Sequence, residues 1–158
     1  MYFIAIAAAV ALDQMIKSAV RSHIAYSVNG QSAYPVIDGF FYITNYHNTG
    51  AAFNFMEDHT ALLLVITAGV LASLLAFLIL RRKTEHRLLL WGVSLIVAGG
   101  VGNMVDRVRW GYVLDYVHLY FFPFIFNFAD VAVCTGCGVV LLYLILSERK
   151  DGGKLPDE

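Results

Sequence analysis

Four long apolar stretches constrain the fold of this chain more than any other feature of its sequence. They cover residues 2–20, 61–80, 88–105 and 128–147. About 20 mostly apolar helical residues span the roughly 30 Å of hydrocarbon in a bilayer, so each stretch is long enough to cross a membrane. Only 15% of the 158 residues are charged and 59% are hydrophobic, whereas a soluble domain carries roughly a quarter charged residues. The sequence predicts one membrane domain, residues 1–158, with four transmembrane helices.

The first apolar stretch, MYFIAIAAAVALDQ, contains small residues that could also belong to a cleaved signal peptide. It has no basic residue ahead of its apolar core, however, and its helical pattern continues through MIKSAV. We therefore expect this stretch to be retained as the first span.

The basic residues predict how the spans are oriented. The connection RRKTEHR at 81–87 holds four of the eleven Lys and Arg residues, and the tail segment SERKDGGK adds three more. Cytoplasmic loops carry an excess of Lys and Arg. We therefore expect the 81–87 loop, the 148–158 tail and both termini to be cytoplasmic. The 21–60 and 106–127 segments would then be extracytoplasmic.

With this topology, many polar residues of the spans fall at one depth, near the outer edge of the membrane. Ionisable residues in a membrane are expensive and usually serve a pathway or a reaction. Helix ends are also the least costly places for charge, so part of the clustering has a simpler explanation. The pattern still favours a functional site at this depth. The residues concerned are Asp13, Lys17, Asn103, Asp106, Arg107, Asn127 and Asp130.

Helical spacing suggests how the charges compensate one another. Asp13 and Lys17 are separated by four residues, so they share a helix face and can form an ion pair. Asp106 and Arg107 carry opposite charges at the end of the third span. The simplest interpretation is that Asp13 pairs with Lys17 and Asp106 with Arg107, and that both ion pairs brace the bundle.

Two carboxylates have no adjacent basic partner: Asp115, in the run VLDYV, and Asp130, in FNFAD at the start of the fourth span. Two carboxyl groups that lie close together cannot both ionise cheaply, so one pKa rises above the ordinary value of about 3.9 and the other stays low. Such a pair holds an acid and a base at once. Aspartic proteases use this arrangement: the ionised carboxylate activates water and the protonated one polarises the scissile carbonyl.

Other catalytic chemistries lack their sequence patterns. The five histidines have no HExxH spacing, and both the GxSxG motif and the GxGD motif of presenilin-like proteases are missing. CTGC at 134–137 has the spacing of a redox or metal motif, but small residues inside a span more often serve helix packing. We expect no metal or other cofactor. Nucleic acid is not expected as a partner either, because the net charge of −1 offers no basic face for phosphates.

Two further function classes remain open from the residues alone. A transporter or proton relay would also place carboxylates in spans, but it would be expected to show broken helices or internal repeats near the midplane, and the sequence shows neither. A non-catalytic membrane scaffold would use its aspartates only to pair with Lys17, Arg107 and Arg109.

The two segments predicted to be extracytoplasmic are rich in aromatic residues. PVIDGFFYITNYHNTGAAFNF mixes aromatic and β-branched residues with turn residues, which predicts short strands within 25–59 at the membrane surface. The connection at 108–126 contains VHLYFFPFIF and carries Asp115. Besides anchoring at the interface, this connection could move as a lid that sets the distance between Asp115 and Asp130.

The chain also contains five separate blocks of distinctive sequence. They are DQMIK (13–17), NTGAAF (48–53), GNMVDR (102–107), VLDY (113–116) and FNFAD (126–130). In order and spacing they resemble the bacterial lipoprotein signal peptidases, the type II signal peptidases, and the resemblance covers essentially the whole chain. The departure from the family pattern is a very short N-terminus with no basic residue before the first span.

The resemblance implies an aspartic endopeptidase in which Asp115 and Asp130 form the catalytic dyad. It implies a mainly α membrane fold with four transmembrane helices, a small extracytoplasmic β-structured cradle and an outer-surface lid connection. The residues that it implies bind substrate or support the site are Asp13, Lys17, Asn48, Gly50, Gly99, Asn103, Asp106, Arg107, Asn127 and Ala129.

The same resemblance implies the reaction. The substrate would be a prolipoprotein whose lipobox cysteine already carries a diacylglyceryl group. The enzyme would cut on the amino side of that cysteine and release the signal peptide. It would act as a monomer in contact with lipid in the cytoplasmic (inner) membrane of a bacterium. Since the acyl chains would stay in the outer leaflet, the scissile bond would lie at the depth predicted for Asp115 and Asp130.

Overall fold

Four helices dominate the part of the chain that the structure, a computed structural model, describes. They are α1 (Tyr2–His23), α2 (Thr60–Arg81), α3 (Arg87–Trp110) and α4 (Phe128–Asp151). Each contains a stretch long and apolar enough to cross a membrane, so the four predicted spans are confirmed.

The described residues are 1–27, 33–50 and 60–151. The end of the NTGAAF block, part of the predicted 21–60 segment and most of the predicted tail therefore lie outside them. The motif residues expected to form the site all fall within them.

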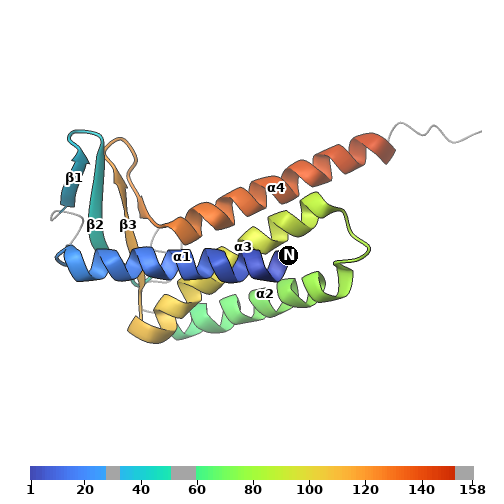
Figure 1. Cartoon of the computed structure of the whole chain (residues 1–158), viewed down its shortest axis with the longest axis horizontal. Coiled ribbons are helices and arrows are strands. Elements are labelled where there is room, and N and C mark those ends of the chain that lie inside the picture. The colour runs from blue at the N-terminus through green and yellow to red at the C-terminus, as the bar shows by residue number, and fades with distance from the viewer. Residues whose placement is uncertain (28–32, 51–59, 152–158) are drawn as a thin grey trace, which may run out of the picture.

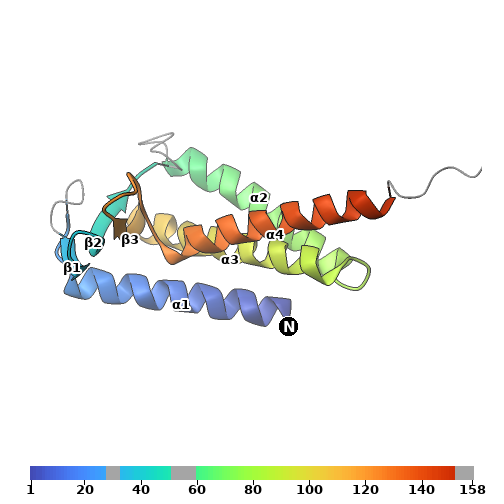
Figure 2. The same ribbon diagram turned by 90° about the horizontal axis from the view of Figure 1, so that it is seen from above.

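The helices pack around α3, which contacts each of the other three. They run along the long axis of the molecule, and the strands lie at one end of the bundle (Figure 1, Figure 2). The C-termini of α1 and α3 and the N-terminus of α4 lie at this end (Figure 1). Residues at these helix ends are therefore neighbours in space although they are far apart in the sequence.

A four-stranded antiparallel sheet occupies this end within the described residues. Its strands are β1 (Ala33–Ile37), β2 (Phe41–Asn48), β3 (Val113–Leu119) and β4 (Ile125–Phe126), in the order β1-β2-β3-β4. The hairpin β1–β2 confirms the strands predicted within 25–59. Gly39 in its turn has φ +73°, a left-handed conformation that glycine adopts without steric cost.

The 108–126 connection contributes the other two strands, which the sequence did not predict. β3 pairs with β2, and Asp115 lies opposite Tyr46 in this pairing. The backbone partners of β3 come from β2, which two spans separate from β3 in the sequence, so no local pattern could reveal them. Asp115 is consequently held inside a sheet. Movement of this connection as a lid stays a prediction.

Alternation along β3 determines which way Asp115 points. Leu114 and Tyr116 are buried in an apolar cluster with Val20 of α1, and this cluster seats the sheet on the helix bundle. Successive side chains of a strand point to opposite faces. Asp115, between Leu114 and Tyr116, is therefore directed away from this cluster.

α3 and α4 approach each other closely where both helices carry glycines. A Cβ added at Gly136 would lie 2.6 Å from the carbonyl oxygen of Gly92, and one added at Gly99 would meet the carbonyl oxygen of Ala129. Small residues allow membrane helices to pack this tightly. The contact of Gly136 agrees with the packing role predicted for the small residues of CTGC.

Substitution of Gly99 by alanine should destabilise the protein, because the new methyl group would press on the α4 backbone beside Asp130. We expect the overpacking to cost about 1–3 kcal/mol, seen as a lower Tm in detergent. Gly138→Ala is the matched control, since a Cβ at Gly138 meets nothing within 4 Å. Equal thermal stability of the two variants would contradict the close approach at Gly99.

Candidate active site

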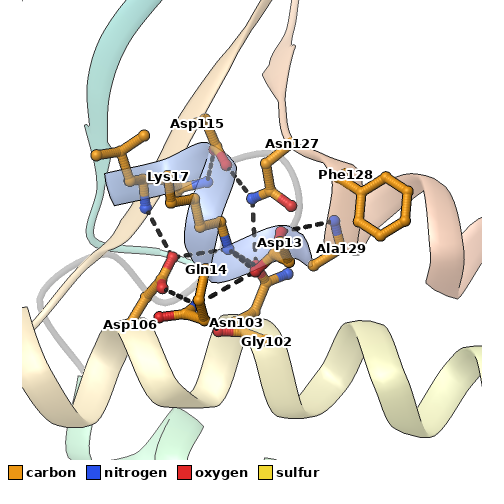
Figure 3. Close-up of polar contacts among 12 residues, drawn as sticks. Asp13, Gln14, Lys17, Gly102, Asn103, Asp106, Asp115, Asn127, Phe128 and Ala129 are labelled. Carbon is orange, nitrogen blue, oxygen red and sulfur yellow. Dashed lines mark hydrogen bonds and ion pairs between the residues drawn. The ribbon is translucent and has the colours of Figure 1, made fainter. Parts of the chain in front are cut away.

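A buried cation lies between α1 and α3. Lys17 Nζ is 2.9 Å from Asp13 Oδ2 and 2.8 Å from Asp106 Oδ2, and all three side chains are almost completely buried (Figure 3). The predicted pairing of Asp13 with Lys17 is confirmed. The predicted pairing of Asp106 with Arg107 is wrong, because consecutive helical residues do not face each other. Asp106 instead turns toward Lys17 on the neighbouring helix.

Further hydrogen bonds complete this triad of Asp13, Lys17 and Asp106. Gln14 Nε2 donates to Asp106 Oδ1 at 2.7 Å and to Asp13 Oδ2 at 3.2 Å. The backbone N–H of Leu114 donates to Asp106 Oδ2 at 3.2 Å, which connects the triad to β3. Sequence reasoning missed Gln14, although it lies inside the DQMIK block, because a neutral amide near a helix end has no pattern that predicts its partners.

Lys17 also fixes the orientation of a neutral amide. Its ammonium donates to Asn103 Oδ1 at 3.0 Å. Since an ammonium can only donate, the oxygen of Asn103 must face Lys17 and the amide nitrogen must face the other way. Asn103 Nδ2 accordingly donates to Asp130 Oδ1 at 2.7 Å. The buried triad thus determines which group is presented to Asp130.

Asn127 connects the two carboxylates predicted to form a pair. Its Nδ2 donates to Asp115 Oδ1 at 2.6 Å, and its Oδ1 accepts from the backbone N–H of Asp130 at 3.0 Å. Asp130 Oδ2 accepts from the backbone N–H of Asn127 at 3.0 Å in return. This reciprocal pattern is a capping box, with Asp130 in the position usually held by Glu or Gln. Asp130 therefore helps to cap the first turn of α4, and Asn127 connects it to Asp115.

Asn48 holds Asp115 from the other side. Its Nδ2 donates to Asp115 Oδ2 at 2.9 Å, while its Oδ1 accepts from the backbone N–H of Gly50 at 3.0 Å. Arg107 donates from Nη2 to the carbonyl oxygen of Gly50 at 2.7 Å. Arg107 thus secures the turn that orients Asn48 instead of pairing with Asp106.

The residues expected to form the site are therefore brought together by the fold. Ala129 joins them through its backbone N–H, which donates to Asp13 Oδ1 at 3.2 Å. Gly99 joins them by packing directly under Ala129. Within the described residues, no group of three or more His, Cys, Asp and Glu side chains is arranged to hold a metal ion.

Both carboxylates line a cavity of about 800 Å³. Apart from the carboxylates, Asn48 and Asn103, its walls are mostly apolar, formed by the turn between β3 and β4 and by the first turns of α4. No local sequence pattern predicts that these segments line one cavity, whose other lining residues are Tyr46, Phe122, Pro123, Phe124, Ile125, Phe126, Val131, Val133, Cys134 and Thr135.

The pKa of Asp115 is raised to about 7, chiefly by burial and then by the negative charge of Asp130. Hydrogen bonds from Asn48 and Asn127 favour the ionised form and oppose this shift. Near neutral pH the cavity therefore presents a carboxyl group that still retains its proton, next to a second carboxyl group. An acid and a base within one cavity can activate water against a carbonyl group.

Comparison with known proteins agrees with this chemistry. Residues 5–146 match the sequence model of the family described as Signal peptidase (SPase) II. The lipoprotein signal peptidase of Halalkalibacterium halodurans is 35% identical over 153 residues, with 94% of each chain covered. That of Streptococcus pyogenes serotype M3 is 38% identical over 148 residues, with 91% of each chain covered.

Solved structures agree as well. A bacterial membrane enzyme determined by the in meso method at 2.3 Å superposes with a TM-score of 0.82 at 26% identity, covering 99% of this chain and 93% of its own. A second, at 1.9 Å, gives 0.76 at 27% identity, covering 90% of this chain and 91% of its own. With its four apolar helices, the chain is a multi-pass membrane protein, and it belongs to the signal peptidase II family of aspartic peptidases.

Proposed function

We propose that Asp115 and Asp130 are the catalytic dyad of this peptidase. The observation that carries the proposal is that both carboxylates line one cavity, where Asp115 has a pKa of about 7. Amide groups, not cations, hold the two side chains. A carboxyl group in contact with a cation would lose its proton at lower pH, so this surrounding preserves an acid near neutral pH.

Family membership makes the chain an enzyme that removes signal peptides from prolipoproteins. We propose more specifically that the prolipoprotein carries a diacylglyceryl group on its lipobox cysteine and is cut on the amino side of that cysteine. The mostly apolar walls of the cavity support a substrate that arrives from lipid. The products are a signal peptide with a new carboxyl terminus and a lipoprotein whose cysteine has a free amino group.

In the proposed reaction Asp130 is the base and Asp115 the acid. The Asp130 carboxylate takes a proton from water, and the water oxygen bonds to the scissile carbonyl carbon while Asp115 gives its proton to the carbonyl oxygen. In the tetrahedral intermediate the amide nitrogen then takes the proton from Asp130, and the C–N bond breaks. Asp115 recovers its proton as the carbonyl re-forms. The dyad ends in its starting protonation state.

The remaining motif residues would support catalysis by holding the two carboxylates in position. Asn103 and Asn127 would fix the direction of the two carboxylates, and the triad of Asp13, Lys17 and Asp106 would orient Asn103. We propose that the protein is active as a monomer.

We propose that the protein lies in the cytoplasmic membrane of a bacterium with both termini inside. The basic α2–α3 connection, RRKTEHR, supports this orientation. Strand β3 and the N-terminus of α4, which carry Asp115 and Asp130, lie at the opposite end of the bundle (Figure 1). This orientation would put the dyad near the outer leaflet, where the diacylglyceryl group of the substrate resides.

Replacing either dyad residue by asparagine should abolish turnover of a diacylglyceryl-cysteine prolipoprotein peptide in detergent. We expect kcat to fall by at least about 100-fold for Asp115→Asn and for Asp130→Asn, because each removes a proton-transfer group. Asp38→Asn, on the β1–β2 turn, is the matched control and should keep normal activity. Near-normal turnover by a folded dyad variant would overturn the proposed mechanism.

Activity should decrease as the pH rises through about 7, because Asp115 then loses the proton that the reaction needs. The Asn48 hydrogen bond stabilises the ionised form of Asp115, so Asn48→Ala should raise the pKa further. We expect the alkaline loss of kcat/KM to move to higher pH in this variant. Profiles measured from about pH 5 to about 9 will check this. A displacement to lower pH, or none, would contradict the assignment of the acid.

A further inference from the structure

The first turn of α4, which carries Asp130, has an acceptor for every backbone N–H group. The first four N–H groups of a helix have no partner within the helix. At the start of α4, counted from its capping residue Asn127, each of these four groups donates to a side-chain oxygen at 3.0–3.2 Å. The donor and acceptor pairs are Asn127 with Asp130, Phe128 with Tyr116, Ala129 with Asp13, and Asp130 with Asn127.

Two of these acceptors belong to the capping box, and the other two come from elsewhere in the fold. Asp13 lies on α1 and is already engaged by Lys17. Tyr116 lies on β3, and its hydroxyl oxygen accepts from Phe128 N at 3.2 Å. Tyr116 has no part in the proposed reaction, yet it directly follows Asp115 in the chain.

Consecutive residues of β3 thus connect the two proposed catalytic groups. Asp115 lines the cavity, whereas the Tyr116 ring is buried on the other face of the strand, among Val20 and Leu114. From there its hydroxyl reaches the first residue of α4. Asp115 supplies one proposed catalytic carboxylate. Tyr116, the next residue, contacts α4, the helix that carries Asp130.

We propose that Tyr116 is a positioning residue for the dyad: its hydroxyl fixes the first turn of α4 and thereby the position of Asp130 relative to Asp115. This inference rests on the proposed function of the two aspartates. Tyr116 is only 7% exposed and is packed against neighbours from α1 and β3, so its hydroxyl has a defined position.

A tyrosine suits this position because it accepts a hydrogen bond without adding charge. Burial raises the pKa of Tyr116 to about 12, so the hydroxyl stays neutral at the pH where the dyad works. A carboxylate at the same place would add a further negative charge beside Asp13, Asp115 and Asp130. A phenylalanine would keep the packing but leave the N–H of Phe128 without its acceptor.

Tyr116→Phe should therefore change catalysis more than substrate binding. A small displacement of Asp130 disturbs the geometry of water attack, and we expect kcat to fall about tenfold. KM should stay unchanged, because the cavity walls are intact. The alkaline loss of activity should also move along the pH scale, because the pKa of Asp115 depends on how close the charge of Asp130 lies.

The experiment compares kcat, KM, the pH profile and Tm of wild type, Tyr116→Phe and Tyr120→Phe with a diacylglyceryl-cysteine prolipoprotein peptide. Tyr120 follows β3 and is 73% exposed, so its variant controls for loss of a tyrosine hydroxyl. A lower kcat with a displaced profile in Tyr116→Phe alone supports the inference. Unchanged kcat and pH profile, whatever the Tm, overturns it.

The same assay separates this inference from the function on which it rests. If Asp115→Asn and Asp130→Asn are inactive while Tyr116→Phe equals wild type, only the role of Tyr116 fails. If a dyad variant remains active, the proposed function fails, and the role of Tyr116 fails with it.

Discussion

The burial of the Lys17 ammonium is the constraint on which the rest of the structure depends. Removing an ion from water costs several kcal/mol even after the protein relaxes, and only good partners offset this cost. Lys17 has two carboxylates and one amide oxygen within 3.0 Å. These partners lie on α1 and α3. Lys17 can reach all of them only when the two helices keep one vertical offset and one rotation relative to each other. The ion pairs therefore fix the relative positions of α1 and α3 at the end of the bundle where Asp115 and Asp130 lie.

The cation influences the proposed dyad through neutral groups. Asp13 and Asp106 form ion pairs with it, and Asn103 accepts a hydrogen bond from it and donates one to Asp130. Asp115 likewise contacts the amides of Asn48 and Asn127. Amides define the direction of a carboxylate without the strong stabilisation of its charge that a contacting cation would give. The structure therefore combines rigid positioning with a high pKa at Asp115, and both are needed for an acid that works near neutral pH.

The sequence predicted the parts of this structure that have a local or periodic signal. Four apolar stretches predicted four helices, and the i, i+4 spacing predicted the pair of Asp13 with Lys17. The partner of Asp106 could not be predicted, because it depends on how α3 is rotated toward α1. Strand β3 was missed because its hydrogen bonds come from β2, a distant segment. Two contacts had no sequence signal beyond the presence of their residues in the motif blocks. They are the hydrogen bond from Phe128 to the Tyr116 hydroxyl and the pair of hydrogen bonds by which Asn103 connects Lys17 with Asp130.

The most direct test of the central claim is a crystal structure with a bound transition-state mimic. The ligand would be a prolipoprotein-derived peptide with a diacylglyceryl cysteine, in which a tetrahedral hydroxyl-bearing carbon replaces the scissile carbonyl. The account predicts that the hydroxyl oxygen lies about 2.5–3.0 Å from a carboxylate oxygen of Asp115 and from one of Asp130. A hydroxyl bound away from either carboxylate, with the peptide seated in the cavity, would contradict it.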